Sequence, residues 1–198
     1  MWDERYDRPE YLFGTEPADF LKREAKLLPP RSRTLCIADG EGRNSVYLAK
    51  LGHQVTAFDA SSSGVEKARK LASQKNARLD FHVSDVEEWD WSQSFDAVVG
   101  VFIQFAPPEL RSWMFQQMAL SVAPGGLLLL HGYAPRQVEY GTGGPPHASH
   151  MYTRDLLQQA FAEFDILRLE DYDAEIDEGE AHSGTSALVD LVARKNNS

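Results

Sequence analysis

The sequence predicts an α/β protein built on a doubly wound sheet of seven strands, mostly parallel with an antiparallel last strand. Short apolar runs alternate with helical segments along most of the 198 residues, which is the pattern of repeated strand–helix–strand units. A glycine turn, Gly40-Glu41-Gly42, joins the first apolar run to the first helix between strands. The last two runs are separated by too few residues for a crossover helix, so we expect them to pair as a hairpin.

Each expected strand is an apolar run bounded by turn residues. Residues 34–38 precede the glycine turn, and a helix over 44–51 follows it and stops at Gly52. Residues 54–58 form the second expected strand, which ends on Asp59. The remaining strands are expected at 79–83, 95–101, 127–131, 164–169 and 186–193.

Capping and breaking residues indicate where the helices begin and end. Ser63 and Glu66 have the S-x-x-E capping-box spacing at the start of the helix after the second strand. Thr153 is expected to cap a helix that ends near Ala160. The run Pro124-Gly125-Gly126 is expected to stop a helix just before the fifth strand.

Composition limits the class of protein and its partners. The length suits a single domain, 1–198, and a net charge of −10 argues against nucleic acid as a partner. The one cysteine, Cys36, excludes a disulfide framework and a multi-cysteine zinc site, and no metal site is expected. No apolar run approaches the ~20 residues of a membrane helix, so we expect a cytoplasmic monomer or homodimer acting on a small molecule, without a membrane partner.

Two segments beside the sheet are candidate covers for a ligand. Residues 1–30 form an N-terminal lid and helix segment, with aromatic side chains that include Trp2, Tyr6 and Phe13. Residues 132–150 form a loop rich in glycine and proline, and a loop of this length in a compact domain is more often functional than idle.

Ligands of such sheets bind beyond the carboxyl ends of the strands. Gly40 and Gly42 let the backbone approach a ligand closely. Asp59 can accept hydrogen bonds from both hydroxyls of a ribose, and Asp85 can accept one from the exocyclic amine of an adenine. The alternatives are a turn residue for Asp59 and a helix N-cap for Asp85.

This series of motifs resembles the class I S-adenosylmethionine-dependent methyltransferases. Residues 40–45 resemble the first motif of that family, Asp59 its ribose acid, 84–86 its adenine-side motif and 120–130 its helix-to-strand stretch. Within the family, the nearest likeness is to the small bacterial methyltransferases related to tellurite-resistance methyltransferases. That likeness is carried by residues 13–17, 107–111, 140–145 and 178–184.

The resemblance implies a Rossmann-like fold over the whole chain, S-adenosyl-L-methionine as cofactor, and methyl transfer to a small acceptor such as a thiol or a metalloid oxyanion. The cofactor-binding residues it implies are Ala38, Gly40, Gly42, Asn44, Asp59, Ala60, Asp85, Val86 and Phe102. Two positions depart from the family. Cys36 stands where an acid is usual, and Ala38 stands where the first glycine is usual. We expect Ala38 to occupy this turn position with a negative φ.

Methyl transfer from a sulfonium is an SN2 displacement, so it needs a base only if the acceptor arrives protonated. His182 and Tyr133 are the preferred catalytic pair because each follows the carboxyl end of an expected strand. The other histidines near the site are His131, His147 and His150. His53 and His82 are interpreted as structural, since neither lies at a carboxyl end.

Two other functions share parts of this pattern. An NAD-dependent oxidoreductase also has a glycine turn and an acid after the second strand, but the third glycine of the dinucleotide fingerprint is missing here. A non-catalytic module that binds the cofactor is the other alternative, because of Cys36 and Ala38. The acidic run 170–178 is interpreted as a solvated hairpin loop, with attraction of cationic acceptors as the alternative.

Overall fold

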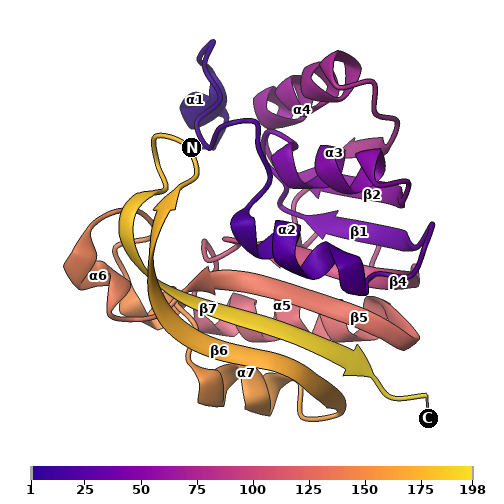
Figure 1. Cartoon of the computed structure of the whole chain (residues 1–198), viewed down its shortest axis with the longest axis vertical. Helices are drawn as coiled ribbons and strands as arrows, with labels where there is room; N and C mark the ends of the chain where they lie inside the picture. Colours follow the sequence, from indigo (N-terminus) through magenta and orange to yellow (C-terminus); the bar gives the residue numbers. More distant parts are fainter. Residues whose placement is uncertain (1, 198) are drawn as a thin grey trace.

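The protein folds around one seven-stranded sheet with the strand order β3-β2-β1-β4-β5-β7-β6 (Figure 1). The computed structural model describes residues 2–197. The strands are β1 (Arg33–Ile37), β2 (Gln54–Asp59), β3 (Asp80–Val83), β4 (Phe95–Val101), β5 (Val122–Tyr133), β6 (Phe164–Asp177) and β7 (Ser183–Lys195). β1 to β5 are parallel, whereas β7 runs antiparallel between β5 and β6. The predicted fold class is therefore confirmed.

Helices cover both faces of the sheet. They are α1 (Trp2–Tyr6), α2 (Asp19–Glu24), α3 (Arg43–Lys50), α4 (Ser62–Gln74), α5 (Pro108–Ser121), α6 (Gln137–Tyr140) and α7 (Arg154–Ala160), with 3-10 turns η1 (Ala25–Leu27) and η2 (Ala148–His150). α2 and α3 pack on one face, and α5 and α7 pack on the other (Figure 1). None of the helices within residues 2–197 is long and apolar enough to span a bilayer.

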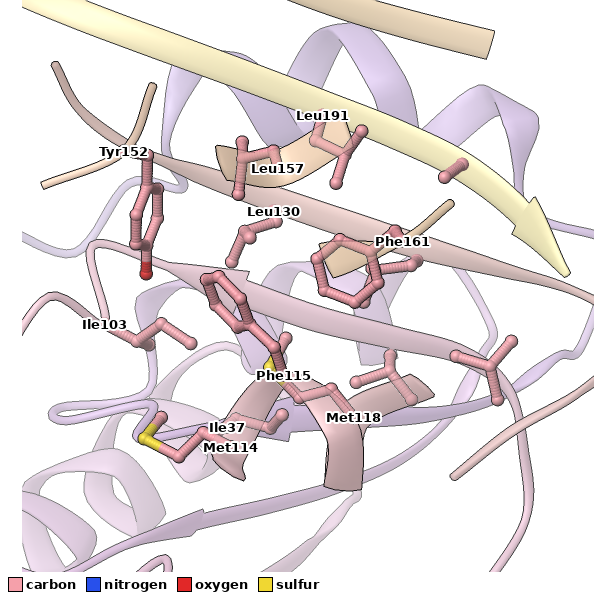
Figure 2. Close-up of a cluster of buried hydrophobic side chains, with 14 of the residues drawn as sticks. Ile37, Ile103, Met114, Phe115, Met118, Leu130, Tyr152, Leu157, Phe161 and Leu191 are labelled. Atoms are coloured by element: carbon pink, nitrogen blue, oxygen red, sulfur yellow. The ribbon is translucent and has the colours of Figure 1, made fainter. Parts of the chain in front are cut away.

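The larger core lies between the sheet and the helices α5 and α7. Side chains alternate between the faces of a strand, so Ile37 points into this core while its neighbour Cys36 faces α2 and α3. Met114 and Phe115 of α5 pack against the sheet beside Leu130 of β5 (Figure 2). This packing fixes the strands whose carboxyl ends form the site.

The acidic run is mostly strand and not the loop that its composition predicts. β6 continues through Asp177 because it pairs with β7 along its whole length, which satisfies the backbone of both strands. Asp171 and Asp173 are neutralised by Arg136, whose guanidinium nitrogens lie 2.5 and 2.7 Å from their carboxylate oxygens. The hairpin is confirmed, and the solvated hairpin loop is wrong.

One expected cap is correct and the other is displaced. The Thr153 hydroxyl accepts a hydrogen bond from the Leu156 amide at 3.1 Å and caps α7. α4 begins two residues earlier than expected, because its N-cap is Ser61, whose hydroxyl accepts from the Gly64 amide at 3.0 Å. The Ser63 amide instead donates to the Asp3 carboxylate of α1 at 3.0 Å.

The Pro124-Gly125-Gly126 run lies inside β5 and does not separate a helix from a strand. α5 ends at Ser121, and β5 pairs with β4 from Val122 onward. The extra residues form a bulge opposite β4, where a Cβ on Gly126 would lie 2.8 Å from the Asp96 carbonyl oxygen. The glycine is needed for this close approach between the two strands.

Candidate active site

A cavity of about 450 Å³ opens at the carboxyl ends of the central parallel strands. The glycine turn after β1 forms one end of it, and the β6–β7 turn (residues 178–182) and the loop before η2 form the other. Trp2, Tyr6 and Phe13 of the N-terminal segment also line it, and Figure 1 shows this segment beside the tip of the β6–β7 hairpin. The size falls within the range of natural ligand sites.

Two of the three positions of the glycine turn require a residue without a side chain. Gly40 has φ 59° and Gly42 has φ 87°, which are left-handed conformations. A Cβ on Gly42 would lie 2.6 Å from the Cβ of Ala68, and one on Gly40 would lie 2.6 Å from the hydroxyl of Tyr6. The turn thus presents bare backbone to the cavity at the start of α3.

Ala38 also has a left-handed backbone, so the expectation of a negative φ is wrong. Its φ is 46°, and Phe102, at the end of the neighbouring strand β4, has φ 55°. The chain bends sharply after β1 because the Asp39 amide donates to the Phe58 carbonyl oxygen at 3.1 Å. Both strained residues line the cavity, where such strain is typically found in proteins.

Asp59 links the end of β2 to the glycine turn. One carboxylate oxygen accepts from the Gly40 amide and the other from the Ser61 amide, each at 2.8 Å. Burial raises the pKa of Asp59, and these two amides oppose that shift. Each oxygen retains a lone pair for a ligand hydroxyl. The next residue, Ala60, also lines the cavity.

Three further predicted cofactor residues lie at the cavity wall. Asp85 and Val86 follow β3, and one Asp85 carboxylate oxygen accepts from the Glu87 amide at 3.1 Å. Asn44, in the first turn of α3, accepts from the Ala18 amide at 2.9 Å and so holds the N-terminal segment against the glycine turn. Eight of the nine predicted cofactor residues line the one cavity, and Gly42 does not.

The predicted catalytic pair is in direct contact. The Tyr133 hydroxyl at the end of β5 is hydrogen-bonded to Nδ1 of His182 in the β6–β7 turn. The His182 ring lies between Phe13 and Phe102, with centroid distances of 4.5 and 4.3 Å. Burial, and secondarily the charge of Arg43, lowers the pKa of His182 to about 3, so its imidazole is neutral at neutral pH. Burial raises the pKa of Tyr133, which keeps its proton.

The remaining histidines divide into two groups. His147 and His150 line the cavity, as expected for a covering loop. His131 does not, although it follows a carboxyl end, because its ring is stacked on Phe20 and its Nδ1 lies 2.6 Å from the Asp190 carboxylate. His131 is therefore wrong as a candidate base. His53 and His82 lie outside the cavity.

A buried ion pair that the sequence analysis missed links the start of α3 to the β6–β7 turn. Nη2 of Arg43 lies 2.8 Å from the Glu178 carboxylate, and both side chains are almost fully buried. Glu178 also accepts from the Asp19 amide at 3.1 Å. No local pattern pairs residues this far apart, but Glu178 lies in one of the stretches that carry the family resemblance.

Comparison with known proteins finds sequence similarity to methyltransferases. Residues 35–126 match a methyltransferase domain family. The ubiquinone biosynthesis O-methyltransferase of Paramagnetospirillum magneticum is 27% identical over 155 residues, which cover 73% of this chain and 62% of that protein. The enzyme of the same name from Xanthomonas axonopodis pv. citri is 32% identical over 132 residues, which cover 65% and 54%. The chain thus spans less than two thirds of these relatives.

Solved structures share the fold over nearly the whole chain. TehB from Haemophilus influenzae has a TM-score of 0.74 at 18% identity, with 98% of this chain and 66% of that chain covered. A structure described under the conversion of a disulfide bond into a thioacetal group during echinomycin biosynthesis has a TM-score of 0.78 at 17% identity, with 99% and 91% covered. The magnesium protoporphyrin IX methyltransferase of Synechocystis PCC 6803, with bound S-adenosylhomocysteine, has a TM-score of 0.69 at 18% identity, with 89% and 80% covered. The chain therefore resembles methyltransferase domains in sequence over residues 35–126, and it shares its fold with solved structures that include a methyltransferase.

Proposed function

We propose that the protein transfers the methyl group of S-adenosylmethionine to a small anionic acceptor, a thiolate or a metalloid oxyanion. The observation that carries this proposal is the Tyr133–His182 pair, which lies in the same cavity as the glycine turn and has a neutral imidazole.

The cavity residues fit the cofactor. Gly40 brings backbone without a side chain to the cavity wall, and Asp59 keeps lone pairs for ribose hydroxyls. Asp85 is available to an adenine amine, with Ala38, Asn44, Ala60, Val86 and Phe102 completing the assigned wall. When bound, S-adenosylmethionine supplies a sulfonium methyl group as the electrophile.

The acceptor has to be small. The cavity of about 450 Å³ lies in the lower part of the usual range for ligand sites, and the cofactor takes up much of it. Phe105, Pro146, His147 and His150 close the acceptor end. The N-terminal segment, proposed as a lid, is fixed by Asp3, whose carboxylate lies 2.6 Å from the Ser61 hydroxyl. Such a cover excludes water and aligns the reactants.

The nucleophile has to arrive already ionised, or nearly so. With a pKa of about 3, His182 is a weak base, so it cannot readily remove a proton from an alcohol or a phenol. A thiol, with an ordinary pKa near ~8.5, is partly ionised at neutral pH, and a phenol, near ~10, is not. Nδ1 of His182 is occupied by Tyr133, which leaves Nε2 to orient the acceptor.

Methylation of a phenolic oxygen is the second candidate, and the names of the curated relatives favour it. The two candidates differ in what the site must do, because a phenol needs a competent base. The tellurite-resistance-type acceptor rests on the sequence resemblance carried by residues 13–17, 107–111, 140–145 and 178–184.

The test is transfer of labelled methyl from S-adenosylmethionine by the purified chain to a panel of thiols, selenite, tellurite and a catechol. We expect transfer to a thiol or a metalloid oxyanion, with His182→Gln and Tyr133→Phe lowering kcat but leaving cofactor affinity unchanged. His53→Gln is the matched control, since His53 is bonded to Ser32 outside the cavity. Transfer to the catechol alone would establish the second candidate. Cofactor binding without any transfer would indicate a non-catalytic module.

A further inference from the structure

Asp39 is a cavity carboxylate without a cationic partner among residues 2–197. It directly precedes the glycine turn and lines the cavity. Its carboxylate accepts hydrogen bonds from the amide of Ser45, at 3.3 Å, and from the Ser45 hydroxyl. Both of these donors are neutral. The nearby guanidinium of Arg43 is already paired with Glu178 at 2.8 Å.

Three carboxylates of the cavity wall have no ion-pair partner within the described part of the chain. They are those of Asp39, Asp59 and Asp85. Lys67 does not compensate them, because its ammonium pairs with Glu41 at 2.5 Å. Burial, together with the charge of Asp59, raises the pKa of Asp39 to about 7. A partly buried carboxylate in this state is stabilised by a cation that a ligand brings.

The residue that stands where the family usually has an acid cannot supply a negative charge. Cys36 is buried in the sheet, and burial raises the pKa of its thiol, so it stays neutral. Residues 33–42, which are fully described, contain two carboxylates, Asp39 and Glu41, and only Asp39 has no ion-pair partner because Glu41 is paired with Lys67. S-Adenosylmethionine and S-adenosylhomocysteine both carry an α-ammonium group, whereas 5′-methylthioadenosine, which lacks the amino acid, does not.

We propose that Asp39 is the carboxylate that binds the ammonium group of the cofactor. The inference rests on the cofactor of the proposed function but not on the identity of the acceptor. It assigns to Asp39 a role in binding and positioning that compensates for the thiol at Cys36.

The competing role for Asp39 is structural, because its contacts with Ser45 also cap the first turn of α3. Asp39→Asn separates the two roles, since its Oδ1 can still accept from the Ser45 amide and its Nδ2 can donate to the Ser45 hydroxyl, while the charge is lost. Calorimetry with the three ligands on the full chain is the measurement. We expect about 10- to 100-fold weaker binding of S-adenosylmethionine and S-adenosylhomocysteine, and less than about threefold for 5′-methylthioadenosine.

Two further variants complete the experiment. Asp59→Asn should weaken all three ligands together, because it acts on the ribose that they share. Ser45→Ala keeps the Asp39 charge and should preserve the preference for ligands with an ammonium group. Melting of each unliganded variant checks that it is folded.

The possible failures are distinguishable. If the wild-type chain binds neither S-adenosylmethionine nor S-adenosylhomocysteine, the proposed function and this inference both fail. The other failures concern a wild type that binds both cofactor forms. If Asp39→Asn then binds all three ligands with wild-type affinity, only the role of Asp39 is overturned. The same holds if Asp39→Asn loses affinity for all three ligands equally.

Discussion

Arg43 and Glu178 are separated by 135 positions in the sequence, yet their side chains form a buried ion pair beside the glycine turn. Arg43 opens α3, and Glu178 lies in the β6–β7 turn that also carries His182. The pair therefore joins the start of α3, next to the glycine turn, to the turn that carries His182. Glu178 extends this connection to the N-terminal segment through the amide of Asp19.

Glu178→Ala should lower the free energy of unfolding by about 3–5 kcal/mol, because it leaves the Arg43 guanidinium buried without its counter-ion. Arg43→Met combined with Glu178→Leu should recover most of that loss, since no charge remains buried. Urea unfolding of the single and double variants forms the cycle. A loss of less than about 1 kcal/mol in Glu178→Ala would mean that the pair behaves like an exposed one.

Ala38→Gly should raise the stability of the protein by about 1 kcal/mol, since glycine adopts the observed φ of 46° without strain. Ala57→Gly is the control. Ala57 is buried in β2 with regular strand geometry, so its replacement should lower stability by about 1 kcal/mol. Both changes are measured by urea unfolding, and equal destabilisation by the two would contradict the strain at Ala38.

The pH dependence of transfer should lack a step near the ordinary histidine pKa. Because burial lowers the pKa of His182 to about 3, its imidazole stays neutral from about pH 5 to 8. With an acceptor that is fully ionised over this range, the contribution of His182 to kcat should therefore be constant. A loss of activity below about pH 6.5 that disappears in His182→Gln would contradict this assignment.

The same residue has a consequence for stability. Since the folded-state pKa of His182 lies below its unfolded value, only the unfolded chain takes up a proton as the pH falls below about 6.5. His182 therefore destabilises the fold progressively from that pH down to about 3, and His182→Gln should be less sensitive to acid than the wild type. Unfolding free energies at about pH 5 and pH 7 give the comparison.

Asp59→Ala should abolish cofactor binding, since it removes the ribose acceptors and releases the amides of Gly40 and Ser61. In the wild type, a ligand at ~100 times its Kd should stabilise the fold by roughly 2.7 kcal/mol. The variant should show no such shift with S-adenosylhomocysteine. Asp165→Ala, on the exposed face of β6, serves as the control. Normal binding by Asp59→Ala would show that the cofactor lies elsewhere.

Much of the fold was predictable because the hydrophobic runs of parallel strands are local. The run 95–101 corresponds to β4 without error, since a central strand is buried on both faces. The rule that ligands bind beyond the carboxyl ends of the strands then predicted Tyr133 and His182 near the site, and both line the same cavity. Their direct contact was found in the structure, whereas their catalytic role stays a prediction.

What the sequence did not predict depends on contacts between distant segments. The acidic composition of 170–178 hid a strand, because its charges are neutralised by Arg136 and Arg43 from elsewhere in the chain. The left-handed backbone of Ala38 follows from a hydrogen bond to β2, which no local pattern shows. The role proposed for Asp39 was not predicted from the sequence, since its lack of a cationic partner is visible only in three dimensions.

The position of β7 between β5 and β6 sets an order in which the molecule can assemble. The ribosome makes β7 after both of its neighbours, so β6 has no strand to pair with until β7 emerges. During that interval the edge of β5 is open, and an open edge is a site for pairing with other chains. His182 lies in the turn between β6 and β7, which takes its position when the two strands pair. Closure of the cavity therefore belongs to the late steps of folding.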